Sequence, residues 1–183
     1  MKLLVVSYNN YNDIELTTPL TILRKADPAI EIEFYNPLHE KQGTLIKGQH
    51  KIIVVESLTY WPNVINYDAI FIPGGQHCLT MREDNAAIEI ARYFLNNNKP
   101  VFAICDAGNV LYEKGIIENY SYSSYPIKDL QAGKRNTSQT SICNNLITGK
   151  SPYAAYELGL LMVKTLYSEE LKNQIKSALN PKG

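Results

Sequence analysis

Short apolar runs alternate with longer segments of mixed polarity along the 183 residues of this chain. The apolar runs predict β-strands at residues 2–7, 31–35, 68–72 and 101–104, with a Tyr/Ser-rich strand at 120–124. Apolar residues at helical spacing predict helices at 18–26, 84–97, 109–114, 152–166 and 168–179, and a short helical turn follows Pro126 and ends at Gly133. Strands that alternate with helices in this way are typical of an α/β fold.

The sequence also predicts two hairpins, each formed by a pair of short strands. Residues 44–47 and 51–56 flank Gly48, and residues 139–143 and 146–148 flank two asparagines. We expect the first hairpin to join the main sheet as a small antiparallel extension. The whole pattern predicts one domain over residues 1–183: a doubly wound, flavodoxin-like sandwich with a mainly parallel sheet and its chemistry at the carboxyl ends of the strands.

The most informative stretch is the buried strand at 101–104, which ends at Cys105. Ala107 and Gly108 then let the backbone turn tightly into a helix, so Cys105 is expected on a sharp strand-to-helix turn. The N–H groups of a helix start favour thiolate over thiol, and thiolate is the reactive form. The alternative is a buried structural cysteine, which is common at the end of an apolar strand. The neighbouring Asp106 would oppose thiolate formation unless it points away and caps the helix, and we favour the cap.

Two other segments should reach the same edge of the sheet. Thr18 and Pro19 form a typical N-cap and first helical residue, which leaves Glu15 in the turn or distorted first turn after the first strand. The strand at 68–72 ends in a Pro-Gly-Gly turn, where the glycines allow two N–H groups to converge on an anion. The alternatives are a capping or solvated Glu15 and an ordinary glycine turn.

Composition narrows the function classes. The chain carries 18 basic and 18 acidic residues, so no net charge attracts nucleic acid or an anionic membrane. The sequence shows no apolar run near 18 residues and no basic leader, and we expect neither a membrane span nor a signal peptide. Three widely spaced cysteines suit reduced thiols in a cytoplasm, and the three histidines show no metal-ligand spacing with them. We therefore expect no metal and no cofactor.

The joint order of these motifs resembles the ThiJ/PfpI superfamily, which includes the Parkinson's-disease-associated protein and has the class I glutamine-amidotransferase-like fold. The resemblance spans roughly residues 1–166 and rests on four stretches, at 14–26, 68–75, 103–105 and 145–158. It implies that Cys105 is a nucleophile and that a protonated Glu15 donates a hydrogen bond to its sulfur. It further implies that Gly75 and the backbone N–H of Asp106 form an oxyanion hole, with Gly74 beside them. Family members are commonly homodimers or higher homo-oligomers, which we carry over as an expectation.

The chain also departs from the family pattern. Catalytic members place a His before a Pro in the segment after the elbow helix, whereas this chain has Tyr125 followed by Pro126. A tyrosine with an ordinary pKa near 10 is a poor base at neutral pH, so a Cys–His peptidase or amidase is doubtful. His77 could in principle substitute, but we expect a polar loop residue near the site. Asp106 is also unusual after the nucleophile.

Three function hypotheses follow. The first is a cysteine-dependent enzyme that acts on a small reactive carbonyl, of the glyoxalase or deglycase type, through a Cys105 thiolate assisted by Glu15. The second is a non-catalytic oxidative-stress sensor or chaperone-like protein in which Cys105 oxidises to a sulfinic acid. The third is a hydrolase that uses His77 or a histidine from a partner chain.

Overall fold

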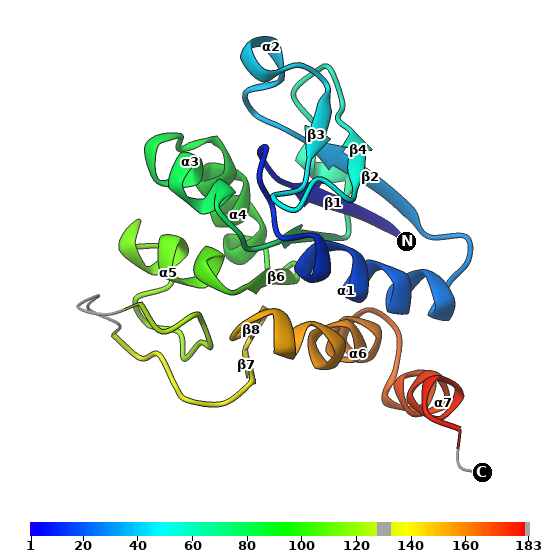
Figure 1. Ribbon diagram of the computed structural model, residues 1–183. Coiled ribbons are helices and arrows are strands. Elements are labelled where there is room, and N and C mark those ends of the chain that lie inside the picture. The colour runs from blue at the N-terminus through cyan, green and yellow to red at the C-terminus, as the bar shows by residue number, and fades with distance from the viewer. Residues whose placement is uncertain (128–132, 182–183) are drawn as a thin grey trace.

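The computed structural model describes residues 1–127 and 133–181, and it places a six-stranded sheet between two layers of helices (Figure 1). The strand order is β2-β1-β5-β6-β8-β7. The strands are β1 (Lys2–Val6), β2 (Glu31–Tyr35), β5 (Ala69–Ile72), β6 (Val101–Ile104), β7 (Thr140–Cys143) and β8 (Leu146–Gly149). Neighbouring strands are parallel except that β7 runs antiparallel to β8. The predicted α/β fold with a mainly parallel sheet is confirmed.

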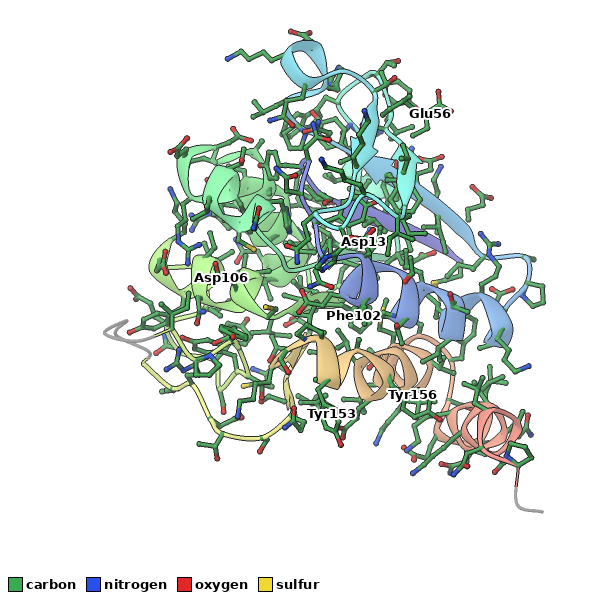
Figure 2. All side chains as sticks on the ribbon, in the orientation of Figure 1. Asp13, Glu56, Phe102, Asp106, Tyr153 and Tyr156 are labelled. Atoms are coloured by element: carbon green, nitrogen blue, oxygen red, sulfur yellow. The ribbon has the colours of Figure 1, made fainter. Side chains whose placement is uncertain are left out.

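Alternate residues of the central strands face opposite helix layers, because side chains in a strand point to the two faces in turn. Leu4 and Ile70 belong to the core under α3 (His77–Glu83), α4 (Ala86–Asn96) and α5 (Asp106–Glu113). Leu3 and Phe102 belong to the core under α1 (Asp13–Ala26) and α6 (Ala155–Leu166), and Figure 2 shows Phe102 close to these two helices. The helix α7 (Glu169–Leu179) begins at Ser168, the predicted N-cap, and packs outside α6 and α1.

The predicted hairpin at 44–56 forms a sheet of its own. Its strands are β3 (Leu45–Lys47) and β4 (Val54–Glu56), which follow the short α2 (His39–Gln42) and pair only with each other. The expectation that this hairpin extends the main sheet is therefore wrong. The hairpin is joined to the rest of the protein by isolated bridges next to its short strands, such as the one between Phe34 and Ser57. The N–H groups of its loop also donate to the carboxylate of Asp13.

Helix α1 begins at Asp13, six residues before Pro19, the predicted first helical residue. Asn12 is its N-cap, and the side-chain oxygen accepts the N–H groups of Ile14 and Glu15 at 3.0 and 3.2 Å. Pro19 lies inside the helix rather than at its first position. Its ring has no N–H to give to the carbonyl of Glu15, but the capped first turn and the buried face hold the helix together.

Other boundaries also differ from the prediction. The helix expected at 84–97 is preceded by α3, and the extended backbone of Asp84 separates α3 from α4. Helix α5 starts at Asp106 rather than residue 109. A 3-10 turn, Pro152–Ala154, precedes α6, and another, Val64–Asn66, precedes β5.

The strand predicted at 120–124 is not formed. Only an isolated bridge joins Tyr122 to Arg135, and the N–H of Ser123 donates to the side-chain hydroxyl of Thr148 instead of to a strand partner. Most of the helical turn predicted between Pro126 and Gly133 falls on residues 128–132, which lie outside the described residues. The predicted pair of strands around residues 144–145 is confirmed as β7 and β8.

The sheet order explains how distant residues meet. Strand β5 lies between β1 and β6, so the segments that follow these three strands emerge side by side at one edge. The chain also changes direction across the sheet at β1, which is where doubly wound folds form their ligand crevice. Across residues 1–127 and 133–181, no helix is long and apolar enough to cross a bilayer.

Candidate functional site

Cys105 occupies a strained turn between β6 and α5. Its backbone has φ 62° and ψ −128°, a conformation that side-chain-bearing residues seldom adopt. Such strain costs about 1–3 kcal/mol and persists only where surrounding contacts hold it. Two hydrogen bonds do so here: the N–H of Cys105 donates to the carbonyl of Gly149 at 2.8 Å, and its carbonyl accepts the N–H of Tyr125 at 3.2 Å. The nucleophile-elbow geometry predicted from the sequence is present.

Glu15 reaches the same point from the first turn of α1. Its side chain is fully buried, and neither carboxyl oxygen has a hydrogen-bond partner of regular geometry among the described residues. Gly74 lies between Glu15 and Cys105. A Cβ placed on Gly74 would lie 2.3 Å from Oε2 of Glu15 and 2.5 Å from Cβ of Cys105. The absence of a side chain at residue 74 is therefore what allows the acid and the thiol to approach.

The sequence suggested that the helix start favours ionisation of Cys105, but burial shifts the pKa of the thiol in the opposite direction. Burial raises the pKa of the Glu15 carboxyl to about 7, against the smaller opposing effects of the Cys105 thiol and the Gly74 N–H. Burial also raises the pKa of the Cys105 thiol, and the negative charge of Glu15 raises it further. The backbone N–H of Asp106 at the start of α5 lowers it, but dehydration outweighs this helix-terminus effect.

The two groups therefore act as one titrating unit. Loss of one proton from the Cys105–Glu15 pair leaves a single negative charge, which either the sulfur or the carboxylate can carry. Both groups are dehydrated, and the pKa of the thiol is raised above that of the Glu15 carboxyl, so the carboxylate beside a thiol is the main form after loss of one proton. A protonated Glu15 beside a thiolate is its minor tautomer, which the N–H of Asp106 stabilises.

The two predicted oxyanion donors lie at the site. Asp106 follows Cys105 directly and directs its N–H toward the sulfur. Gly75 has φ +112°, and a Cβ there would lie 2.3 Å from the N atom of Asn12, so only glycine fits. Both residues line the cavity described below. The oxyanion role itself stays a prediction.

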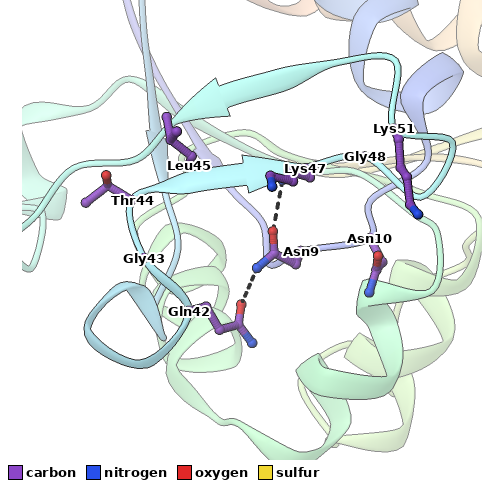
Figure 3. A pocket seen from close by; sticks show the side chains of 9 residues that line it. All are labelled: Asn9, Asn10, Gln42, Gly43, Thr44, Leu45, Lys47, Gly48 and Lys51. Atoms are coloured by element: carbon purple, nitrogen blue, oxygen red, sulfur yellow. Dashed lines mark hydrogen bonds between the residues drawn. The ribbon is translucent and has the colours of Figure 1, made fainter.

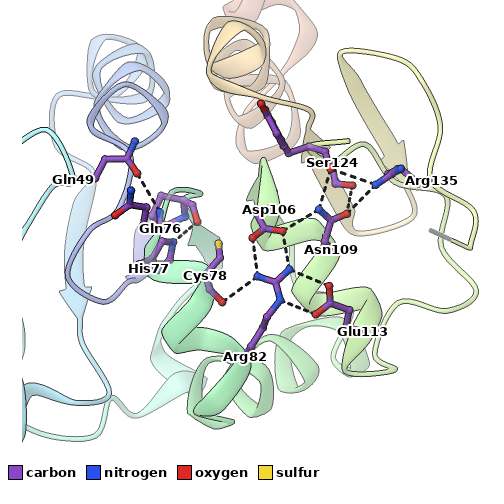
Figure 4. Close-up of polar contacts among 12 residues, drawn as sticks. Gln49, Gln76, His77, Cys78, Arg82, Asp106, Asn109, Glu113, Ser124 and Arg135 are labelled. Carbon is purple, nitrogen blue, oxygen red and sulfur yellow. Dashed lines mark hydrogen bonds and ion pairs between the residues drawn. The ribbon is translucent and has the colours of Figure 1, made fainter. Parts of the chain in front are cut away.

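The carboxylate of Asp106 does not cap α5 as expected. Arg82 on α3 binds it with both terminal nitrogens, at 2.7 and 2.8 Å, and Asn109 donates to it at 3.0 Å (Figure 4). Burial alone would raise the pKa of Asp106, but the Arg82 guanidinium reverses the shift and lowers it. The N-cap residue of α5 is Cys105 itself, without a side-chain cap bond.

His77 is a buried helix residue, not the polar loop residue expected. Its Nε2 lies 2.7 Å from the carbonyl of Pro73, and its Nδ1 accepts the N–H of Tyr8 at 3.4 Å. Burial lowers the pKa of His77 to about 4, so the ring is neutral at physiological pH. Its two nitrogens are bound to backbone groups, and His77 is not among the residues that line the cavity.

A cavity of about 490 Å³ opens over the Cys105–Glu15 pair. Tyr125 is at its rim and 46% exposed. Polar and apolar groups share the wall, which is formed by Asn12, Glu15, Gln49, Gly75, Gln76, Leu79, Cys105, Asp106, Tyr125, Ile127 and Pro152. The size suits a small molecule rather than a folded polypeptide.

A second cavity, of about 530 Å³, is lined by Asn9 and Asn10 of the β1–α1 loop and by residues of the segment 42–51 (Figure 3). Its wall contains Lys47, Lys51 and several amide side chains, with Asn9 bridging Gln42 and the N–H of Lys47. Among the described residues that line it there is no cysteine, histidine or carboxylate. Within the described part of the chain, no three His, Cys, Asp or Glu side chains are grouped to hold a metal ion.

Sequence reasoning missed several residues of the site. Gln49 comes from the hairpin loop and accepts the N–H of Gln76 at 3.1 Å, and no local signal marks either. Arg82 was missed because α3 is short and was not predicted. Asn12 could have been found, since an Asn three residues before a Glu is a capping pattern.

The chain is similar to proteins of known and unknown activity. It shares 30% identity over 177 residues with an uncharacterized protein, MG029, of Mycoplasma genitalium, covering 95% of this chain and 92% of that protein. It shares 32% identity over 131 residues with a protein of Pyrococcus horikoshii named Deglycase PH1704, covering 70% of this chain and 75% of that protein.

Structural comparison shows that the fold is shared with a solved structure. Schizosaccharomyces pombe DJ-1 matches with a TM-score of 0.82 over 100% of both chains, at 21% identity, which shows a shared fold. The model of the DJ-1/PfpI family matches residues 1–165. With the elbow cysteine and the fold both in place, the resemblance found in the sequence is confirmed: the chain belongs to the DJ-1/PfpI family.

Proposed function

We propose that this protein is a cysteine-dependent enzyme that acts on small reactive carbonyl compounds, of the glyoxalase or deglycase type. The observation that carries the proposal is the approach of Glu15 to Cys105 across Gly74, under a cavity of about 490 Å³. The Pyrococcus relative named a deglycase supports the same class of chemistry. The proposal needs no cofactor, because the thiol and the carboxyl supply a nucleophile and an acid.

The first step is addition of the Cys105 thiolate to an aldehyde carbon. A carbon–sulfur bond forms, and the electron pair of the C=O bond moves to oxygen. The N–H groups of Asp106 and Gly75 would stabilise that oxygen, and Glu15 would give it a proton, which yields a neutral hemithioacetal. Glu15, now a carboxylate, can accept a proton in the next step. No histidine base is required, which suits a site with Tyr125 at its rim.

The proposal is tested by consumption of methylglyoxal. We expect Cys105→Ser to reduce kcat/KM by at least about a thousandfold, because a hydroxyl is a far weaker nucleophile than a thiolate near neutral pH. Cys143→Ser, on the edge strand β7, is the matched control and should retain full activity. Equal consumption by the Cys105→Ser variant and the unmodified protein would refute the proposal.

A second candidate, a thiol-based oxidative-stress sensor, is favoured by the position of Cys105. Cys105 and Cys143 are both partly exposed, but Cys143 does not line the cavity as Cys105 does, and Cys78 is fully buried. A sulfinic acid on Cys105 would lie beside Glu15 and the start of α5. Mass spectrometry after mild peroxide decides this: two added oxygens confined to Cys105 support sensing, and oxidation elsewhere with Cys105 unmodified opposes it.

The hydrolase alternative has less support. His77 is bound to backbone groups, and the cavity wall contains no histidine among the described residues. Cytoplasmic location and assembly into a homodimer or higher homo-oligomer remain part of the proposal. Cell fractionation tests the location, and light scattering of the purified protein tests the assembly.

A further inference from the structure

Arg82 lies between two carboxylates of the helix that follows the nucleophile. Besides its paired bonds to Asp106, it donates through Nε and Nη2 to Glu113 at 2.8 and 2.9 Å (Figure 4). A fifth hydrogen bond runs from Nη1 to the carbonyl of Cys78 at 3.3 Å. Arg82 thus joins α3 to both ends of α5, and its side chain is only 24% exposed.

This arrangement sets the charge next to the thiol. Asp106 is covalently adjacent to Cys105, and its negative charge opposes ionisation of both Cys105 and Glu15. A paired guanidinium offsets that charge at close range. Among the described residues, the titratable and charged groups near the elbow are Glu15 from α1, Asp106 from α5, His77, Cys78 and Arg82 from α3, and Tyr125 and Arg135 from the segments beside Asn109.

Arg82 also fixes the direction of the Asp106 side chain. Asn109 donates both to Asp106 and to the carbonyl of Tyr125, each at 3.0 Å. The N–H of Tyr125 in turn binds the carbonyl of Cys105. A chain of hydrogen bonds therefore runs from Arg82 around the elbow and back to the nucleophile.

We propose that Arg82 is a positioning residue that offsets the charge of Asp106 and thereby makes the Cys105–Glu15 pair easier to deprotonate. The role of Arg82 in catalysis rests on the proposed function. The charge of Asp106 alone would oppose ionisation of the nucleophilic cysteine. Because Arg82 offsets that charge, Asp106 can follow the nucleophile directly.

The test compares variants that remove one or both charges of the Arg82–Asp106 pair. The measurement is the rate at which iodoacetamide alkylates Cys105 as a function of pH. Arg82→Met leaves Asp106 uncompensated, and we expect the pH midpoint to rise by about one unit, so that alkylation below the midpoint slows about tenfold. Arg82→Met combined with Asp106→Asn removes both charges, and we expect the rate to return to within about twofold of the unmodified protein. Arg82→Lys keeps the charge and should remain within about threefold.

The controls separate this role from a structural one. Arg92→Met removes an exposed partner of Glu89 on α4 and should leave the profile unchanged. A merely structural Arg82 predicts that the double variant alkylates as slowly as Arg82→Met, and that result would overturn the proposal. An unchanged midpoint in Arg82→Met would also overturn it. If Arg82→Met does not fold, the Arg82→Lys variant supplies the test. A pH midpoint of alkylation raised by about one unit in that variant would count against charge compensation, because lysine keeps the charge.

The alkylation readout does not depend on turnover. If the variants behave as expected while methylglyoxal is not consumed, the proposed function fails and the role of Arg82 stands. If methylglyoxal is consumed through Cys105 but the double variant shows no rescue, the role of Arg82 fails alone.

Discussion

Two carboxylates in the first turn of α1 lie two residues apart and have opposite surroundings. Asp13 accepts three backbone N–H groups from the hairpin loop, those of His50 at 3.0 Å, Ile53 at 3.0 Å and Ile52 at 3.3 Å. Glu15 is fully buried, and neither of its carboxyl oxygens accepts a hydrogen bond of regular geometry among the described residues. Burial would raise the pKa of Asp13, but its hydrogen bonds outweigh burial and lower it, whereas the pKa of Glu15 rises to about 7.

The contrast indicates different roles for the two acids: Asp13 stabilises the structure, whereas Glu15 is placed to exchange a proton. Asp13, whose pKa is lowered, holds the hairpin loop as a carboxylate and, with it, Gln49 at the cavity wall. Glu15 is kept dehydrated and able to exchange a proton near neutral pH. One helix turn, capped by Asn12, positions both.

The largest effect is expected at Asp13. Asp13→Ala leaves three N–H groups without their acceptor, and we expect the free energy of unfolding to fall by about 4 kcal/mol. Urea unfolding measures this. Because the folded-state pKa of Asp13 is lowered, its contribution is present above the unfolded pKa and is lost as the pH falls through the folded value. The stability gap between Asp13→Asn and the unmodified protein should therefore close in acid, and a gap that widens in acid would contradict the account.

Glu15 should show the opposite pH dependence. Its folded pKa is raised, so the unmodified protein loses stability as the pH rises from about 4.5 to about 7. Glu15→Gln removes this titration, and its stability relative to the unmodified protein should increase by about 3 kcal/mol from pH 4 to pH 8. Urea unfolding at both pH values is the measurement. A difference that stays constant would mean that Glu15 ionises normally in the folded protein.

A smaller effect is expected at Gly74. A side chain there would push Glu15 away from Cys105, so Gly74→Ala should lower stability by about 2 kcal/mol and strongly reduce the reactivity of Cys105. Gly43→Ala is the matched control: Gly43 has φ +81° but open space around it, so we expect about 1 kcal/mol of backbone strain and an unchanged site. Equal alkylation rates in the two variants would refute the close approach across Gly74.

The sequence predicted the parts of the molecule that local patterns encode. The apolar run at 101–104 and the small residues after it indicated the elbow, and β2 was placed at its observed bounds. The start of α1 was misplaced because Thr18 and Pro19 imitate a helix start, while the operative cap, Asn12, lay in a polar turn.

Contacts made only by folding could not be predicted. Arg82 and Asp106 are 24 residues apart on different helices, and Asp13 binds a loop about 40 residues away. The raised thiol pKa of Cys105 likewise depends on burial under the cavity wall, which the helix-terminus argument ignores. Sequence motifs indicated the candidate reacting groups, whereas their electrostatic surroundings depend on the tertiary structure.

The most direct test of the central claim is the pH dependence of Cys105 alkylation, followed by mass spectrometry of the Cys105 peptide. If the Cys105–Glu15 pair titrates as a unit, the unmodified protein should show a midpoint near 7, set by the raised pKa of Glu15. Glu15→Gln removes the carboxyl that titrates near 7, so the step at that pH should disappear and the alkylation rate should keep rising through higher pH, because burial raises the pKa of the thiol itself. Coincident profiles for the two proteins would contradict the claim that Glu15 controls the reactivity of Cys105.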